Sequence, residues 1–433
     1  MRNKKILIPL FQEYYLFEYF KYLVPTLCSQ GHKVYLLSFN DKVLKSFENN
    51  NNLVKVSGNR IIRFLYNRNG NYLYYIALWP LSFFWGHYLK LRYQLDFCIL
   101  PWDNKTIWYN FSKVFKSLTI HNTTEYIDLE LTLNRDTVDK SPLINSLWHK
   151  FYQYLDDAFS KKFFYRVKNK ILFYDHHLFW DRLFGKRSKA NFLGFSQVEY
   201  ITVTGNKIKE NLMKAGLSDE KIKVLGNPSY DFIDELRKEW NDEVKEEFCK
   251  QHDIPLEKTI YTLFLSPSKF SDKQRGEVTD VLEAINEVDK NSYFIVKFHP
   301  KTRKIDPPRF KEDILNFTKN FQLITDFGGD LFNAKLMLVS KAIVQKQCTL
   351  GFLAIRLKIP MISYDLVQTD YEDDMYKRMK ASLHCESINE LKTSVEMLDS
   401  KVEYLYELQV KASENYSLDN NASISIGKLI STF

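Results

Sequence analysis

The feature that most constrains this chain is a succession of short apolar runs, each ending in polar or turn residues and followed by a helical pattern. The opening shows the repeating unit: an apolar run at KKILIPL, an amphipathic segment that stops at Gly31, and a second run at HKVYLLSF. Such a succession is typical of the βαβ unit of a parallel sheet. Further runs occur at LDFCILP, KSLTIHN and VEYITVTG. The first half therefore predicts a Rossmann-like α/β sheet.

A second series of runs predicts a second sheet. Near residue 205 the sequence changes to VTGNKIKENLMKAGLSDEKIKVLGNPSYDF, which contains a strand, a helix ending at Gly216, a short strand and a Gly-Asn-Pro turn. A charged segment, 233–258, indicates a solvated linker helix. Five runs follow: TIYTLFLSPSK, SYFIVKFHPKT, FQLITDF, KAIVQKQCT and PMISYD. Since 433 residues exceed what one core organises, we expect two Rossmann-like domains facing a central cleft, 1–232 and 233–410, and a C-terminal helix, 411–433, that packs back on the first.

Composition narrows the class of protein. The cysteines are odd in number and widely spaced, without a metal-site pattern, and they are Cys28, Cys98, Cys249, Cys348 and Cys385. This usage is typical of a reduced, cytoplasmic protein, and we interpret the N-terminal apolar run as a strand rather than a signal peptide. The net charge of +8 suits an anionic partner. Nucleic acid is disfavoured because the sequence has no RNA-binding aromatic motif, zinc finger or basic arm.

One apolar segment, Tyr72 to Tyr88, leaves two interpretations open. It carries no formal charge and is rich in Tyr, Trp and Phe, as are segments at a membrane interface. It is short for a bilayer span of roughly 20 residues, and Pro80 interrupts it. The segment is either a buried helix pair against the first sheet or a peripheral contact with the inner face of the cell membrane, made by Trp79, Phe83 and Trp85.

The strongest candidate for chemistry is YFIVKFHPKT, where an apolar strand delivers Lys297, His299 and Lys301 into the loop at its end. Pro300 fixes the backbone just after the imidazole. A histidine can donate to a non-bridging phosphate oxygen while lysines supply positive charge. This pattern predicts a site for a phosphate or diphosphate leaving group.

Two further loops could contribute to the same site. In AIVQKQCTLGF a strand meets a polar loop and a helix starts near Leu350, so that backbone amides and the Thr349 hydroxyl could bind an anion. Gly351 would permit close approach. In LFLSPSK two hydroxyls follow a strand. The candidates added by these loops are Gln347, Cys348, Thr349 and Gly351 from the first, and Ser266 and Ser268 from the second.

A transfer to a hydroxyl also needs a general base. The first half offers three strand-end candidates in ILPWDN and LTIHNTTEYID, namely His121, Glu125 and Asp103. We favour His121, with Glu125 next.

With these residues in view, the chain resembles a known family. The succession VTGNKIKENLMKAGLSDEKIKVLGNPSYD, VKFHPKT and QKQCTLGFLAIRLKIPMISYD is similar to the second half of GT-B glycosyltransferases that build capsule, lipopolysaccharide or teichoic acid polymers. The His-Pro pair is shared by sialyltransferases, Kdo transferases and glycerol-phosphate polymerases, which use CMP- or CDP-activated donors. The resemblance implies that His299 and Pro300 contact the donor phosphate and that Thr349 lies near it.

Two departures from the family pattern concern the donor nucleotide and the general base. Leu353 stands where many relatives have a glutamate that binds the ribose of a UDP-sugar, which disfavours a UDP donor with that contact. The acidic motif that supplies the base in several sialyltransferases is absent.

We therefore expect an inverting, metal-independent transferase of the hexosyl, sialyl or Kdo type that needs no cofactor. Its donor would be a nucleotide sugar, best a CMP-activated acidic sugar, bound by the second domain. The first domain would bind a surface glycan or lipid-linked glycan acceptor. Three alternatives stay open: a CDP-polyol phosphotransferase, a nucleotide-sugar 2-epimerase of the same fold, and a catalytically silent scaffold of a glycan assembly complex.

Overall fold

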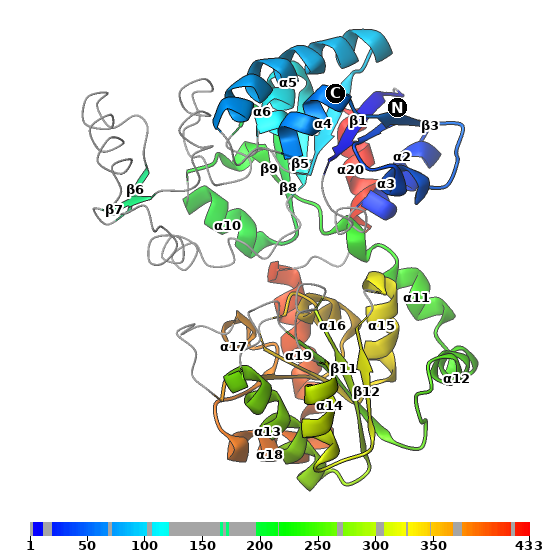
Figure 1. The fold of residues 1–433 in the computed structure, drawn as a ribbon, viewed down its shortest axis with the longest axis vertical. Helices are drawn as coiled ribbons and strands as arrows, with labels where there is room; N and C mark the ends of the chain where they lie inside the picture. The colour runs from blue at the N-terminus through cyan, green and yellow to red at the C-terminus, as the bar shows by residue number, and fades with distance from the viewer. Residues whose placement is uncertain are drawn as a thin grey trace. The chain divides into compact units, whose positions relative to one another are not determined.

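A computed structural model of the chain describes residues 3–11, 20–67, 72–101, 106–120, 165–167, 170–172, 196–214, 216–265, 272–299, 307–325, 328–346, 348–366, 375–416 and 421–433. The chain divides into two compact units (Figure 1). Unit 1 comprises Met1–Ser229 with Asn420–Phe433, and unit 2 comprises Tyr230–Asp419.

Unit 1 is built on a seven-stranded parallel sheet with the order β3-β2-β1-β4-β5-β8-β9. Its strands are β1 (Lys5–Leu10), β2 (Lys33–Ser38), β3 (Leu53–Ser57), β4 (Phe97–Leu100), β5 (Lys116–Ile120), β8 (Tyr200–Val203) and β9 (Ile222–Val224). Every apolar run expected to be a strand in this half is one. A separate antiparallel pair, β6 (Tyr165–Val167) and β7 (Lys170–Leu172), also belongs to this unit.

Helices cover both faces of this sheet because strand side chains alternate between two cores. Ile6 and Ile8 of β1 pack with α2 (Leu23–Ser29), α3 (Asp41–Lys45) and α20 (Ala422–Ser431). Leu7 of the same strand packs with α4 (Arg60–Asn67), α5 (Tyr72–Tyr93) and α6 (Thr106–Val114). Helix α10 (Asn206–Lys214) and two short 3-10 turns, Asp219–Lys221 and Pro228–Tyr230, follow β8 and β9.

Unit 2 is built on a six-stranded parallel sheet with the order β12-β11-β10-β13-β14-β15. Its strands are β10 (Thr259–Phe264), β11 (Ser292–Lys297), β12 (Phe321–Ile324), β13 (Ala342–Gln345), β14 (Met361–Tyr364) and β15 (Leu383–Cys385). Its helices are α11 (Ile233–Glu239), α12 (Asp242–Gln251), α13 (Asp272–Val288), α14 (Pro307–Leu315), α15 (Gly329–Val339), α16 (Gly351–Leu357), α17 (Met375–Met379), α18 (Ile388–Glu396) and α19 (Leu398–Tyr416). The two Rossmann-like α/β domains expected from the sequence are therefore present.

Two expectations about helices need correction. The segment 233–258 is not a solvated linker helix, because Asn241 accepts a hydrogen bond from the Val244 N–H and starts α12 as a separate helix. Phe248 and Cys249 of α12 are buried against the sheet. The boundary expected after residue 410 falls inside α19, which continues to Tyr416.

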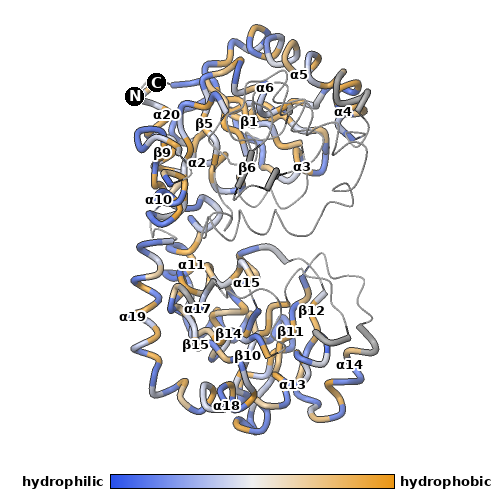
Figure 2. Tube along the Cα trace, turned by 90° about the vertical axis from the view of Figure 1, so that its left-hand side faces the viewer, coloured by the Kyte–Doolittle hydropathy of each residue, from blue (hydrophilic) through white to orange (hydrophobic). Residues whose placement is uncertain are grey.

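The aromatic segment of unit 1 forms one helix, α5, with Pro80 inside it. One side of α5 is buried at Leu78, Trp85 and Leu89, where it packs with α4 and α6. The opposite side of α5 is exposed. Figure 2 colours each residue of the described chain by its hydropathy, and α5 is labelled in it. None of the helices that the structure describes is long and apolar enough to cross a membrane.

Candidate functional site

The order of the second sheet defines where a ligand would bind. From β10 the chain proceeds to β11 and β12 on one side, then returns to place β13 on the other side of β10. Phe264 at the end of β10 is in register with both Lys297 of β11 and Gln345 of β13. In open parallel sheets, ligands bind at the carboxyl ends of the strands where the order reverses. The loops after β10 and β13 are therefore the expected ligand loops of unit 2.

The end of β11 carries the predicted Lys297 and His299 to this point. The Lys297 side chain is buried, and its Nζ lies 5.6 Å from the centre of the Phe332 ring. The Lys297 carbonyl accepts a hydrogen bond of 3.0 Å from the Leu265 N–H, which fixes the end of β11 against β10. Phe298 packs into the core, and the half-buried His299 follows it. A buried cation held on an aromatic ring is a strong local source of positive charge.

The loop between β13 and α16 approaches the same lysine. Burial raises the pKa of the Cys348 thiol to about 11, while a hydrogen bond from the Leu350 N–H and the charge of Lys297 act in the opposite direction. Lys297 ends β11 and Cys348 follows β13, and both strands pair with β10 in register at Phe264, so the end of β11 and the loop after β13 lie at the same edge of the sheet. The fold thus places Lys297 and Cys348 at strand ends on one edge of the second sheet, and their role in one binding site stays a prediction.

Gly351 has a structural reason to be glycine. A Cβ atom at this position would lie 2.4 Å from the Tyr376 ring and 2.7 Å from Gln345 Nε2. Tyr376 is fully buried, and its hydroxyl donates a hydrogen bond of 2.6 Å to the Cys348 carbonyl. Tyr376 therefore holds the loop in place, and the close approach that Gly351 permits is to this ring.

The start of α16 differs from the open anion site expected from the sequence. The helix begins at Gly351, and its N-cap residue, Leu350, makes no side-chain capping bond. The N–H groups of Gly351 and Phe352 donate to the carbonyls of Cys348 and Thr349 within the same loop. Because these amides already have partners, we assign positive charge at this site to side chains rather than to the helix start. The Thr349 side chain is exposed beside them.

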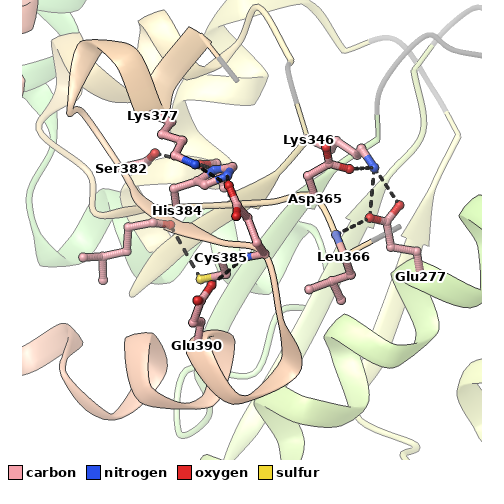
Figure 3. Close-up of polar contacts among 12 residues, drawn as sticks. Glu277, Lys346, Asp365, Leu366, Lys377, Ser382, His384, Cys385 and Glu390 are labelled. Carbon is pink, nitrogen blue, oxygen red and sulfur yellow. Dashed lines mark hydrogen bonds and ion pairs between the residues drawn. The ribbon is translucent and has the colours of Figure 1, made fainter. Parts of the chain in front are cut away.

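A partly buried charge cluster lies at the ends of β13 and β14 (Figure 3). Lys346, directly after β13, contacts both carboxylate oxygens of Glu277 at 2.9 and 3.0 Å and Asp365 Oδ1 at 2.6 Å. The Glu277 side chain is only 1% exposed, and it also accepts a hydrogen bond of 2.8 Å from the Leu366 N–H. Burial and these two carboxylates raise the pKa of the neighbouring Tyr364. The cluster joins α13, β13 and β14, so it fixes the start of the ligand loop.

Glu277 and Asp365 were not among the residues predicted from the sequence. Asp365 follows a strand, as the predicted residues do, and could have been chosen by the same rule. Glu277 carries a subtler signal: it lies on the apolar stripe of α13, one turn before the buried Val281. A carboxylate on a buried helix face predicts a buried cation partner, but the sequence does not say which one.

A second polar cluster near β15 is structural. His384 Nδ1 lies 3.0 Å from the Ser363 hydroxyl, and His384 Nε2 lies 3.4 Å from Glu386 Oε1. Lys377 also pairs with Glu386. The arrangement resembles a Ser-His-acid chain, but Ser363 is fully buried, so a substrate cannot reach its oxygen. We interpret this cluster as a link between β14 and β15.

The remaining predicted residues lie outside the described part of the chain. They are the base candidates Asp103, His121 and Glu125 and the donor-site candidates Ser266, Ser268, Pro300, Lys301 and Gln347. The strands before the base candidates, β4 and β5, are described, and β4 lies beside β1 where the order of the first sheet reverses. Among the described residues, no three His, Cys, Asp or Glu side chains are placed to hold a metal ion.

Comparisons with known proteins show the fold. No family model and no curated protein match the sequence. Solved structures that match over almost the whole chain include UDP-GlcNAc 2-epimerase from Methanocaldococcus jannaschii (TM-score 0.58, 14% identity, 99% of this chain and 100% of that one). A glycosyltransferase from Rickettsia africae matches with a TM-score of 0.56 and 14% identity over 99% of this chain and 98% of that one. The wall teichoic acid polymerase TagF matches with a TM-score of 0.56 and 12% identity over 100% of this chain and 88% of that one. The chain therefore has the two-domain GT-B fold, which these three proteins share.

Proposed function

We propose that this chain is an inverting, metal-independent glycosyltransferase that uses a nucleotide-activated sugar. The observation that carries the proposal is that Lys297 and the loop containing Cys348 lie at the strand reversal of the second sheet, with His299 two residues after Lys297. The half-buried imidazole of His299 can contact a departing nucleotide phosphate, and the buried Lys297 adds positive charge without direct contact. Cations from side chains supply this charge without a metal ion, so chelators should leave the activity unchanged.

In the proposed reaction, an acceptor hydroxyl attacks the anomeric carbon of the donor from the face opposite the phosphate. The new bond joins acceptor oxygen to carbon, the carbon–oxygen bond to the phosphate breaks, and the nucleotide leaves with that electron pair. His299 donates to a non-bridging phosphate oxygen, and the hydroxyl proton passes to a base in the first domain. His121, Glu125 and Asp103 are the base candidates.

The donor we propose is a CMP-activated acidic sugar. Leu353, which stands where many UDP-sugar enzymes have a ribose-binding glutamate, is fully buried in α16. An apolar, buried side chain cannot bind a ribose hydroxyl, so this chain lacks that contact to UDP. The acceptor would be a capsule, lipopolysaccharide or related surface glycan, reached at the inner face of the cell membrane through the aromatic segment 72–88.

A 2-epimerase is the second candidate, and the carboxylates of Glu277 and Asp365 are the observation in its favour. An epimerase needs acidic groups near the sugar, and Glu277 of α13 and Asp365, directly after β14, both contact Lys346 at the end of β13. Both are paired with Lys346, which favours a structural role and therefore the transferase. Proton NMR of UDP-GlcNAc incubated with the protein distinguishes the two, because only an epimerase converts it to the 2-epimer.

Two measurements test the transferase. In a thermal-shift panel of CMP, CDP, UDP and GDP we expect the cytidine nucleotides to raise the melting temperature most, since a ligand of the folded state stabilises it. We also expect slow release of free nucleotide from a CMP-sugar, abolished in His299→Ala and retained in His87→Ala, which changes an exposed histidine on α5. Equal hydrolysis by both variants would refute the role of His299. Donor binding without hydrolysis or transfer would favour a scaffold.

A further inference from the structure

Helices α4 and α5 carry half of the large hydrophobic side chains that are exposed in the described part of the chain. Of twelve such side chains, six lie on these two helices. The six, with their exposed fractions, are Ile61 (64%), Phe64 (48%), Leu81 (41%), Phe84 (68%), Tyr88 (59%) and Leu91 (79%). The other six are scattered over the rest of the described chain. We refer to the six on α4 and α5 as the α4–α5 face.

Four of the six residues of the α4–α5 face share one side of α5, and the other two lie on the helix that packs against α5. On α5, Leu81, Phe84, Tyr88 and Leu91 follow one another at intervals of three or four residues, the spacing of one side of a helix. The opposite side of α5 is anchored in the core. Helix α4 packs directly against α5 and adds Ile61 and Phe64. Contiguous apolar surface of this kind marks an interaction site.

The segment that contains this face carries only positive formal charges. From Asn49 to Leu95 the sequence contains Lys55, Arg60, Arg63, Arg68, Lys90 and Arg92 and no Asp or Glu. Arg60, Arg63 and Arg92 are exposed beside the apolar residues. The asymmetry extends to the whole unit: unit 1 has 34 basic and 19 acidic residues, a net charge of +15, whereas unit 2 has 27 basic and 34 acidic residues, a net charge of −7.

We propose that the α4–α5 face is the surface by which the protein docks on an anionic phospholipid membrane. The inference deepens the proposed function, because it identifies the partner surface through which a lipid-linked acceptor would be reached. Apolar side chains would enter the interface while the arginines bind lipid phosphates. A second copy of this chain is a poorer occupant, since a two-fold contact through this face would bring its arginines together.

The α4–α5 face differs from the membrane contact that the sequence indicated, which consisted of Trp79, Phe83 and Trp85. Trp85 is 8% exposed and stacks on Phe39 in the core. Trp79 stacks on Phe83 and lies under the Lys113 ammonium, 5.0 Å from the ring centre. Substituting these residues would disturb packing rather than test docking. The residues that test it are Phe84, Tyr88 and Leu91, together with the three exposed arginines.

The test is co-sedimentation of the full chain with vesicles of phosphatidylcholine alone or with added phosphatidylglycerol. We expect binding that requires phosphatidylglycerol and weakens with salt. Replacing Arg60, Arg63 and Arg92 by Gln should lower the partition coefficient by about a hundredfold, since each basic residue near an anionic surface contributes about 1 kcal/mol. Replacing Phe84, Tyr88 and Leu91 by Ser should lower it by about tenfold or more.

Matched control variants replace the same number of exposed apolar or basic residues in unit 2. Leu256, Tyr404 and Val410 are exposed hydrophobic residues of unit 2, and changing them to Ser should leave partitioning unchanged. Changing the exposed Lys238, Lys250 and Lys411 to Gln should do the same. Equal losses in face and control variants would overturn the proposal, as would absence of vesicle binding or a concentration-dependent dimer that the face variant abolishes. The nucleotide thermal shift should persist in the face variants, so failure of docking is distinguishable from failure of the proposed activity.

Discussion

Replacing Lys346 by Met should destabilise unit 2 strongly. The substitution keeps an unbranched apolar side chain but removes the ammonium that contacts both oxygens of Glu277 and one of Asp365. Glu277, with its side chain only 1% exposed, would keep the hydrogen bond from the Leu366 N–H but lose the ammonium that contacts both of its oxygens. Removing one member of a buried ion pair costs about 3–5 kcal/mol. For a unit of this size we expect the melting temperature to fall by roughly 10 °C.

Differential scanning calorimetry of three variants separates the possible causes. Lys341→Met removes an ammonium 3.0 Å from Asp399, whose side chain is 83% exposed, and should cost less than about 1 kcal/mol. The double variant Glu277→Gln, Lys346→Met should recover at least half of the loss, because an amide carries no buried charge. If Lys346→Met cost no more than Lys341→Met, the cluster would not stabilise the ligand loop as we argue.

Three further outcomes follow from the same contacts. Gly351→Ala should lower the free energy of unfolding by about 1–3 kcal/mol, because the new Cβ would collide with Tyr376 and Gln345; a urea titration showing no loss would contradict this packing. Burial lowers the pKa of His32 below 6.5, and its Nδ1 accepts the Lys4 N–H in the neutral form, so the stability this contact gives should be complete above pH 6.5 and decrease as the pH falls. Melting curves of His32→Gln should show a smaller loss on acidification, and an equal loss would argue against this role. Nucleotide release from a CMP-sugar should be the same with and without EDTA, and inhibition by EDTA restored by a divalent cation would contradict a metal-independent reaction.

The strands of this fold could be predicted because their signal is local. Runs such as KILIPL and YFIVK are apolar on both faces, as expected for strands covered by helices on each side, and each proved to be a strand. Sequence analysis missed two strands of the parallel sheets, β3 and β15, which are short and carry few fully buried residues, and it also missed the antiparallel pair β6 and β7. The acidic helix α12 was misjudged because two buried residues, Phe248 and Cys249, were outweighed by its charges.

The candidate site could be predicted only in part. Lys297 and His299 follow a strand directly, so the rule that ligands bind at strand ends was enough to select them. Glu277 comes from a helix, and its partner Lys346 is distant in sequence, so their contact depends on tertiary packing that a single sequence does not reveal. At the start of α16 a local rule failed. The rule says that the first amides of a helix have no backbone partner, but here the Gly351 and Phe352 N–H groups donate to carbonyls of the preceding loop.

Hydrogen exchange of the full chain, with and without the nucleotide that gives the largest thermal shift, tests the central claim most directly. We predict slower exchange in peptides that contain Leu265, His299 and Lys346–Phe352, and unchanged exchange in α4 and α5. Protection confined to unit 1, or no protection in unit 2 at saturating nucleotide, would contradict a donor site at the strand reversal of the second sheet.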